Sequence, residues 1–170
     1  MPSKLKIGIS ACLTGEKVRY DGESKLDRQL LDSLSGVAEL VPICPEVDCG
    51  LTIPRPKMEL RGETESPRIV VIETSRDLTD KFTSWSAGKI NELEKLDLDG
   101  FIFKSRSPSC GISVPVWDES GSVIGSAPGI FAGLFIKSFD DAITADEEKL
   151  NGGDRLRQFL ESCSDIATCR

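Results

Sequence analysis

The chain has 170 residues, a formal net charge of −7 at pH 7, six cysteines and no histidine. A chain of this length fits one globular domain, and 39% hydrophobic with 29% charged residues excludes wholesale disorder. The acidic balance disfavours nucleic acid and favours a small molecule as partner, and the absence of histidine excludes Ser-His-Asp and Cys-His catalysis and His-ligated zinc.

The first predicted element is a strand over residues 4–10, in which Leu5, Ile7 and Ile9 alternate with other residues. Its apolar stretch is shorter than the roughly 7–15 residues of a secretory signal, and no apolar run approaches the ~18–20 residues needed to span a membrane. We therefore expect a cytoplasmic protein with no membrane segment. In that reducing compartment, its cysteines are expected to be thiols rather than a disulfide framework.

Predicted helices and strands then alternate along the chain. We expect a helix over 27–34, strands over 37–43, 68–72 and 100–103, a helix over 78–96, a hairpin of 113–117 with 122–124, a buried helix over 128–136 and a charged amphipathic helix over 144–160, with an irregular stretch after Pro54. This alternation predicts an α/β fold with a mainly parallel sheet, and so a ligand site at the carboxyl ends of the strands. We divide the chain into an α/β domain over 1–140 and a helical extension over 141–170 that packs on it or trails from it.

Three cysteines lie just past predicted strands or in the loop that follows one: Cys12, Cys44 and Cys110. Because the carboxyl ends of parallel strands share one edge of the sheet, these thiols are expected to converge there. Three thiols suit a closed zinc site poorly, since that site needs four ligands, but they suit an iron–sulfur cluster with one open iron. The alternative for each of them is a buried cysteine that serves packing alone.

The other cysteines are less informative. Cys49 lies five residues after Cys44 and is open to three interpretations: a fourth ligand, a redox partner of Cys44 or a packing residue. Cys163 and Cys169 lie outside the strand-end pattern and are expected to be incidental.

Three longer motifs contain the strand-end cysteines. They are Ser10-Ala-Cys-Leu-Thr-Gly15 with Val18-Arg-Tyr-Asp-Gly22, then Cys44-Pro-Glu-Val-Asp-Cys-Gly-Leu51, then Lys104-Ser-Arg-Ser-Pro-Ser-Cys-Gly111. In this order, over residues 5–138, they resemble the DUF523 family, whose characterised type is the thiouracil desulfurase. The resemblance implies a Rossmann-like three-layer α/β domain that binds a [4Fe-4S] cluster through Cys12, Cys44 and Cys110. At Cys49 the family usually has a small residue, so a fourth thiol near the cluster is a departure from its pattern.

The resemblance also implies an activity, the removal of thione sulfur from a thiolated pyrimidine such as 2-thiouracil. This is a net hydrolysis without electron transfer, in which hydrosulfide leaves. With no histidine available, Glu46 is the candidate base, two residues from Cys44, and the family resemblance points to the same position. The alternative is that the Glu46 carboxylate stabilises a helix beginning after Pro45.

A serine-rich loop follows the strand predicted over 100–103. The resemblance favours Ser105 for a direct catalytic role, and the hydroxyls of Ser107 and Ser109 are candidates for substrate binding. The alternative for all of them is turn chemistry around Pro108.

Three charged residues are further candidates. Lys104 and Arg106 could hold an anionic substrate or sulfide, or they are solvated. Asp21 is an acid-base candidate, although an Asp-Gly pair is typical of a turn.

Two other functions use the same residues. One is a cluster-based sulfur carrier or transferase, against which the acidic surface argues if the acceptor is tRNA. The other is a non-catalytic thiol-redox module in which Cys44 and Cys49 cycle through a disulfide, but their spacing is not the Cys-x-x-Cys of redox helices.

Overall fold

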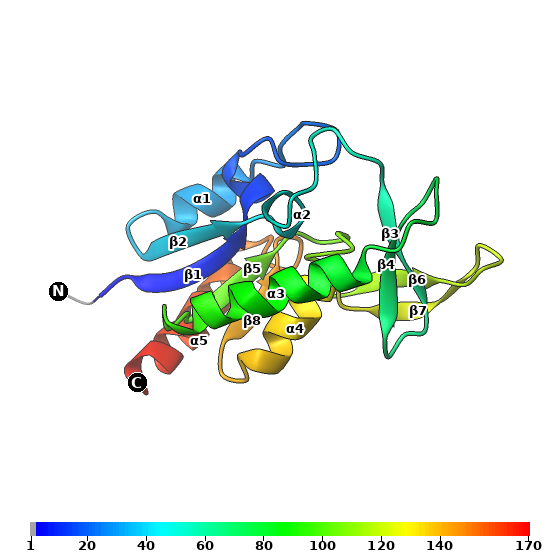
Figure 1. Cartoon of the computed structure of the whole chain (residues 1–170). Coiled ribbons are helices and arrows are strands. Elements are labelled where there is room, and N and C mark those ends of the chain that lie inside the picture. Colours follow the sequence, from blue (N-terminus) through cyan, green and yellow to red (C-terminus); the bar gives the residue numbers. More distant parts are fainter. Residues whose placement is uncertain (1–2) are drawn as a thin grey trace.

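The computed structural model describes residues 3–170 and contains a four-stranded sheet, sheet A, in which all strand pairs are parallel. Its strands, in the order β2-β1-β5-β8, are β2 (Ala38–Ile43), β1 (Leu5–Ser10), β5 (Gly100–Phe103) and β8 (Ile143–Asp146) (Figure 1). The predicted α/β fold with a mainly parallel sheet is confirmed.

Helices cover both faces of sheet A, which gives three layers (Figure 1). On one face, α1 (Arg28–Leu34) and α5 (Gly153–Thr168) pack against Ile7 and Ile9 of β1. On the other face, α3 (Thr79–Glu94) and α4 (Ile130–Ser138) pack against Phe101 and Phe103 of β5. The two faces are therefore filled separately, mainly by aliphatic side chains on the first and by phenylalanines in stacked and edge-to-face contact on the second.

The alternation of β1 explains why a glycine lies between its isoleucines. Ile7 and Ile9 are fully buried on one face, so Gly8 points to the other, toward Phe101. A Cβ atom on Gly8 would lie 2.2 Å from Phe101 Cδ2, a distance that no side chain tolerates. Glycine at this position lets the large ring lie directly on the central strand.

A second four-stranded sheet, sheet B, lies beside sheet A and its helices (Figure 1). Its strand order is β4-β3-β6-β7. It consists of two antiparallel hairpins, β3 (Met58–Gly62) with β4 (Pro67–Val71) and β6 (Val114–Trp117) with β7 (Val123–Ala127), joined by a parallel pairing of β3 with β6. The predicted hairpin over 113–124 is confirmed. Strand β3 was expected to be irregular, because its charged residues hide the alternation; Glu59 and Arg61 form an ion pair at 2.6 Å while Leu60 between them is fully buried.

The expected helix over 144–160 is wrong in its first part. Residues 143–146 form β8 at the edge of sheet A, and helix α5 begins only at Gly153. The strand forms because Ile143 and its neighbours hydrogen-bond along β5, and this tertiary pairing overrides the local charged pattern. The proposed extension from residue 141 onward stays a prediction about domain organisation.

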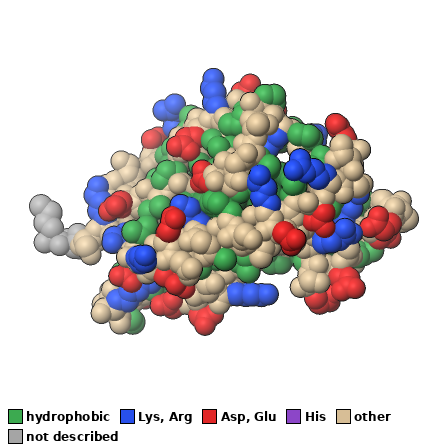
Figure 2. All heavy atoms as spheres, in the orientation of Figure 1, with side chains coloured by type: hydrophobic (Ala, Val, Ile, Leu, Met, Phe, Trp, Pro, Cys, Tyr) green, Lys and Arg blue, Asp and Glu red, His purple; other side chains and the backbone are tan. Residues whose placement is uncertain are grey.

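Figure 2 shows acidic and basic side chains interspersed over the visible face rather than separated by sign. Within residues 3–170, no helix is both long and apolar enough to cross a membrane.

Candidate functional site

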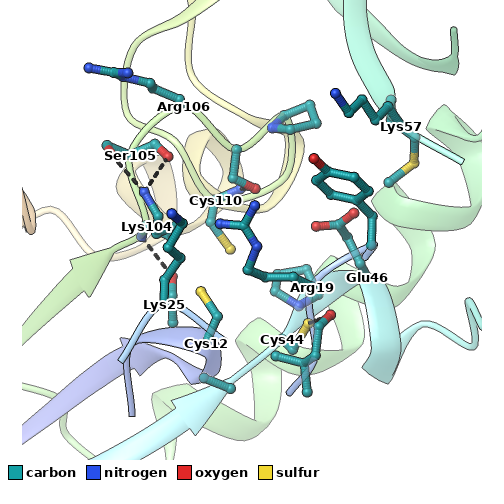
Figure 3. Close-up of a pocket in the computed structure, with 18 of the residues that line it drawn as sticks. Cys12, Arg19, Lys25, Cys44, Glu46, Lys57, Lys104, Ser105, Arg106 and Cys110 are labelled. Atoms are coloured by element: carbon teal, nitrogen blue, oxygen red, sulfur yellow. Dashed lines mark hydrogen bonds between the residues drawn. The ribbon is translucent and has the colours of Figure 1, made fainter. Parts of the chain in front are cut away.

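A pocket of about 450 Å³ lies at the carboxyl edge of sheet A. The loops after β1, β2 and β5 form most of its wall, and Met58 at the start of β3 and Ile72 just after β4 close one side. Six of the predicted site residues line this pocket: Cys12, Cys44, Glu46, Ser105, Ser107 and Cys110. Figure 3 labels all of them except Ser107. Residues that are up to 98 positions apart in the sequence (12 to 110) are thus brought to one cavity.

The three predicted ligand thiols come from three different loops. Cys12 lies in the short 3-10 helix η1 (Ala11–Thr14), and Cys44 is the residue before helix α2 (Pro45–Asp48). Cys110 lies in the loop that follows β5. All three are free thiols, two of them buried and Cys44 half-buried, and Figure 3 shows them on the same side of the cavity.

Burial determines the protonation of these thiols. It raises the pKa of Cys12 and of Cys44 to about 11, and it raises the pKa of Cys110 further. Cys12 and Cys44 add to the rise at Cys110, because a second and a third negative charge nearby would be repelled. With their pKa values raised in this way the three are neutral thiols at pH 7, and a bound metal centre would take them as thiolates.

The donor set fits a cluster better than a single ion. Among the residues that the structure describes, no group of three or more Cys, Asp or Glu side chains is arranged to hold one metal ion. The three thiols instead reach one cavity from three loops, and an iron–sulfur cluster can take each thiolate on a different iron. The type and the number of the donors therefore suit a cluster.

The pocket wall is positively charged, although the whole chain carries a net charge of −7. Its basic side chains are Arg19, Lys25, Arg55, Lys57, Lys104 and Arg106, against the acidic Glu46 and Glu148. Nearby Lys104 and Arg19 both act to lower the pKa of Cys12, in opposition to its burial. Such a wall offsets the negative charge that three thiolates would bring into the pocket.

Glu46 lies in α2 with its carboxylate held from two sides. Oε1 accepts a hydrogen bond from Arg55 Nε at 3.2 Å, and Oε2 accepts one from Ser109 Oγ at 3.4 Å. In the described residues no backbone N–H donates to this carboxylate; the Cys44 N–H is instead bonded to Asp48 Oδ2 at 3.2 Å. Asp48 therefore makes the hydrogen bond to the backbone at the start of α2, and Glu46, which lines the pocket, is held by side chains.

Arg55 is a further residue of the site that sequence reasoning missed. Its side chain is 3% exposed, and besides Glu46 it donates to the carbonyl oxygens of Val18 at 2.6 Å and Thr52 at 3.2 Å. It thus ties the loop after β1 to Glu46. No local sequence signal distinguishes this buried arginine from an exposed one.

Ser107 and Ser109 take different places. Ser107 lines the pocket, and its Oγ accepts hydrogen bonds from the N–H groups of Ser109 at 3.3 Å and Cys110 at 3.2 Å, so it also serves the turn. Ser109 is fully buried behind the wall, with its hydroxyl between Glu46 and the Cys110 sulfur. Substrate binding stays a prediction for both, and the contacts of Ser109 are those of a residue that orients its neighbours.

Ser105 is held by a residue that sequence reasoning missed. Its N–H donates to Glu147 Oε2 at 2.7 Å and its hydroxyl donates to Glu147 Oε1 at 2.8 Å. Glu147 directly follows β8, which brings it to the same edge of sheet A as the cysteines. The sequence pattern predicted a helix over 144–160, so it did not place Glu147 at the end of a strand.

The remaining candidates lie outside the pocket or at its rim. Cys49 packs against the core of sheet B and its thiol donates to the Glu46 carbonyl at 3.3 Å; Cys163 is fully buried between α5 and sheet A; Cys169 is exposed. Asp21 forms an exposed turn, with its carboxylate accepting from the Glu23 N–H. Arg106 extends into solvent at the pocket rim, where it pairs with Glu148.

The start of helix α4 anchors the Cys110 loop. The N–H groups of Ile130, Phe131 and Ala132 have no partner within their own helix and donate to carbonyl oxygens of Pro108 and Ser109 at 3.1–3.2 Å. A Cβ atom on Gly129 would lie 2.6 Å from the Ser109 carbonyl carbon and 2.7 Å from the Pro108 oxygen. Helix and loop are therefore in direct backbone contact.

We expect Gly129→Ala to damage the site as well as the fold, because the crowded atoms are backbone atoms that cannot turn aside. The expected loss of unfolding free energy is about 1–3 kcal/mol, with a parallel fall in the iron retained after reconstitution. Chemical denaturation and iron analysis measure the two effects. Gly88→Ala, in open space on α3, is the matched control; equal iron retention in both variants would contradict the anchoring role.

Comparison with known proteins gives two matches. Residues 7–147 match the family described as 2-thiouracil desulfurase. Among solved structures, the chain is similar to the [4Fe-4S]-dependent thiouracil desulfidase TudS, a DUF523 protein, with 30% sequence identity, a TM-score of 0.73 and coverage of 93% of this chain and 99% of that one. No curated protein sequence matches.

Proposed function

Because the chain belongs to the 2-thiouracil desulfurase family, we propose that it removes the thione sulfur of a thiolated pyrimidine such as 2-thiouracil by hydrolysis and releases hydrosulfide. It is an enzyme of the thiouracil desulfidase type. One observation carries the proposed hydrolysis. The thiols of Cys12, Cys44 and Cys110 and the carboxylate of Glu46, which is paired with Arg55, line the same pocket, and its volume suits a small molecule.

The proposed cofactor is a [4Fe-4S] cluster held by Cys12, Cys44 and Cys110. When bound, this group supplies a soft Lewis acid with one iron free of protein ligands, to which thione sulfur has affinity. The surrounding chain contributes a buried site and basic side chains that offset negative charge. Lys104 and Arg19 are the two that act on Cys12 most directly.

Glu46 is the proposed general base. It takes a proton from the water molecule that attacks the thiocarbonyl carbon, while the carbon–oxygen bond forms and the carbon–sulfur bond breaks. Water and thiouracil together yield uracil and hydrogen sulfide, so the balance requires no electrons. Arg55 and Ser109 hold the carboxylate in one orientation. A catalytic group that is already held in its reactive orientation lowers the activation barrier of the reaction.

Ser105, the serine expected to have a direct catalytic role, and Ser107 are the proposed substrate contacts. Both residues line the part of the pocket wall that comes from the loop after β5. Uracil-type rings carry N–H and C=O groups at their edge, and hydroxyl groups pair with either.

Anaerobic reconstitution followed by turnover tests the proposal. We expect roughly four iron and four sulfide per chain, and equimolar uracil and free sulfide from 2-thiouracil with no reductant present. Reaction in ¹⁸O-labelled water should place the label in the new carbonyl group. A protein that fails to take up iron would contradict the proposed [4Fe-4S] cofactor. Sulfur that stays on the protein or passes to an acceptor, instead of appearing as free sulfide, would favour the alternative function of a sulfur carrier or transferase.

A further inference from the structure

A buried carboxylate lies behind the pocket wall at Ser105. Glu147 is 9% exposed, and it accepts both the N–H and the hydroxyl of Ser105, at 2.7 and 2.8 Å. The ammonium group of Lys104 bonds to the same carboxylate oxygen, Oε1, and also donates to Ser105 Oγ at 3.0 Å. The three side chains form a closed network (Figure 3 shows the Lys104 and Ser105 part of it).

This network leaves the Ser105 hydroxyl with one remaining hydrogen-bonding position. A hydroxyl has one proton and two lone pairs. The proton is donated to Glu147, and one lone pair accepts from Lys104. The remaining lone pair can only accept, so the group that Ser105 meets in the pocket must be a donor.

Glu46, the proposed base, lies across the pocket from Ser105 (Figure 3). A water molecule beside Glu46 is therefore on the opposite side of the substrate from Ser105. The donor that fits at Ser105 is a ring N–H of the substrate, and in 2-thiouracil both N–H groups flank the thiocarbonyl carbon.

We propose that Glu147 is a positioning residue that fixes Ser105 as an acceptor for a ring N–H next to the thiocarbonyl, and so selects substrates that carry this N–H. The inference rests on the proposed function. It also assigns a role to the chain beyond residue 140, because β8 exists at the edge of sheet A and delivers Glu147 to the site.

The kinetic test uses the reconstituted enzyme with 2-thiouracil and with 1,3-dimethyl-2-thiouracil, which lacks both ring N–H groups. Glu147→Gln keeps the size of the side chain but can accept with only one of its two terminal atoms, so it cannot satisfy both Ser105 donors. We expect the KM for 2-thiouracil to rise about 10-fold and the preference for 2-thiouracil over the dimethyl analogue to shrink by a similar factor. Ser105→Ala should show the same changes, and the double variant should show no more than either single one.

The control is Glu161→Gln, the same chemical change on the exposed face of α5, which should leave KM and preference unchanged. Equal iron content in all variants separates positioning from cluster loss. Additive effects of Glu147→Gln and Ser105→Ala, or an unchanged KM in Glu147→Gln, would overturn the inference.

A second readout does not depend on turnover. In the apo protein, the Ser105 amide hydrogen should exchange with solvent at least about 10-fold faster in Glu147→Ala than in the unmodified chain, by NMR; if Glu147→Ala does not fold, the Ser105 hydroxyl and amide resonances of Glu147→Gln answer the same question. Unchanged Ser105 signals would refute the contact.

The two proposals can fail separately. If the contact is found but the loaded enzyme releases no sulfide from 2-thiouracil, the proposed function fails and the positioning contact stands. If turnover is normal and does not depend on Glu147, the proposed function stands and the inference fails.

Discussion

Cys110→Ser should leave a folded protein that neither retains iron nor releases sulfide. The substitution changes one buried atom, but a hydroxyl oxygen is a poor ligand for iron compared with a thiolate. We expect iron after reconstitution to fall to less than half of the unmodified level and sulfide release to fall by more than ~10²-fold. Iron and sulfide analysis, visible absorbance and a sulfide assay measure these losses, and Cys12→Ser and Cys44→Ser should behave alike.

Cys49→Ser is the matched control. Cys49 does not line the pocket and its thiol bonds to a backbone carbonyl, so this variant should keep its iron and its activity. Loss of iron in Cys49→Ser would make Cys49 a ligand and contradict the three-thiol assignment. Retention of iron in Cys110→Ser would contradict it equally.

Glu46→Gln should separate chemistry from cofactor binding. The amide keeps the size of the side chain but cannot take a proton from water, so we expect kcat to fall by roughly 10²–10⁴-fold while iron content stays unchanged. Steady-state sulfide release, normalised to iron, measures the effect.

Glu39→Gln makes the same change on the exposed side of β2 and should have full activity. A Glu46→Gln variant that works at the full rate with its cluster intact would remove Glu46 as the base. The proton would then have to pass to another group at the pocket, such as the exposed rim carboxylate Glu148.

Several parts of the fold could be predicted from the sequence because they depend on local patterns. The strand over 100–103 was predicted with its observed bounds. A short run of apolar residues indicates a buried strand or a buried helix segment, and four residues are too few for a helix. The helices over 28–34 and 79–94 follow the regular spacing of their apolar residues. Strand β3 escaped detection because its charged residues hide the alternation and because its parallel pairing with β6 joins segments that are far apart in sequence.

The sequence by itself determined the positions of Cys12, Cys44 and Cys110 at strand ends, and hence their meeting at one pocket, because parallel strands in one sheet end at one edge. The absence of histidine also excluded an imidazole base, and the proposed base is therefore a group of another kind, the carboxylate of Glu46.

Only the tertiary structure decided which side chains hold these groups in place. Arg55 is bound to Glu46 across nine residues, and Glu147 to Ser105 across 42. Hydrogen bonds of this kind leave no periodic trace in a sequence, since a charged residue looks the same whether its partner is water or another strand. Burial is a property of the folded chain alone. Arg55 and Glu147 are both buried, so each needs a partner inside the protein, and those partners are groups of the site.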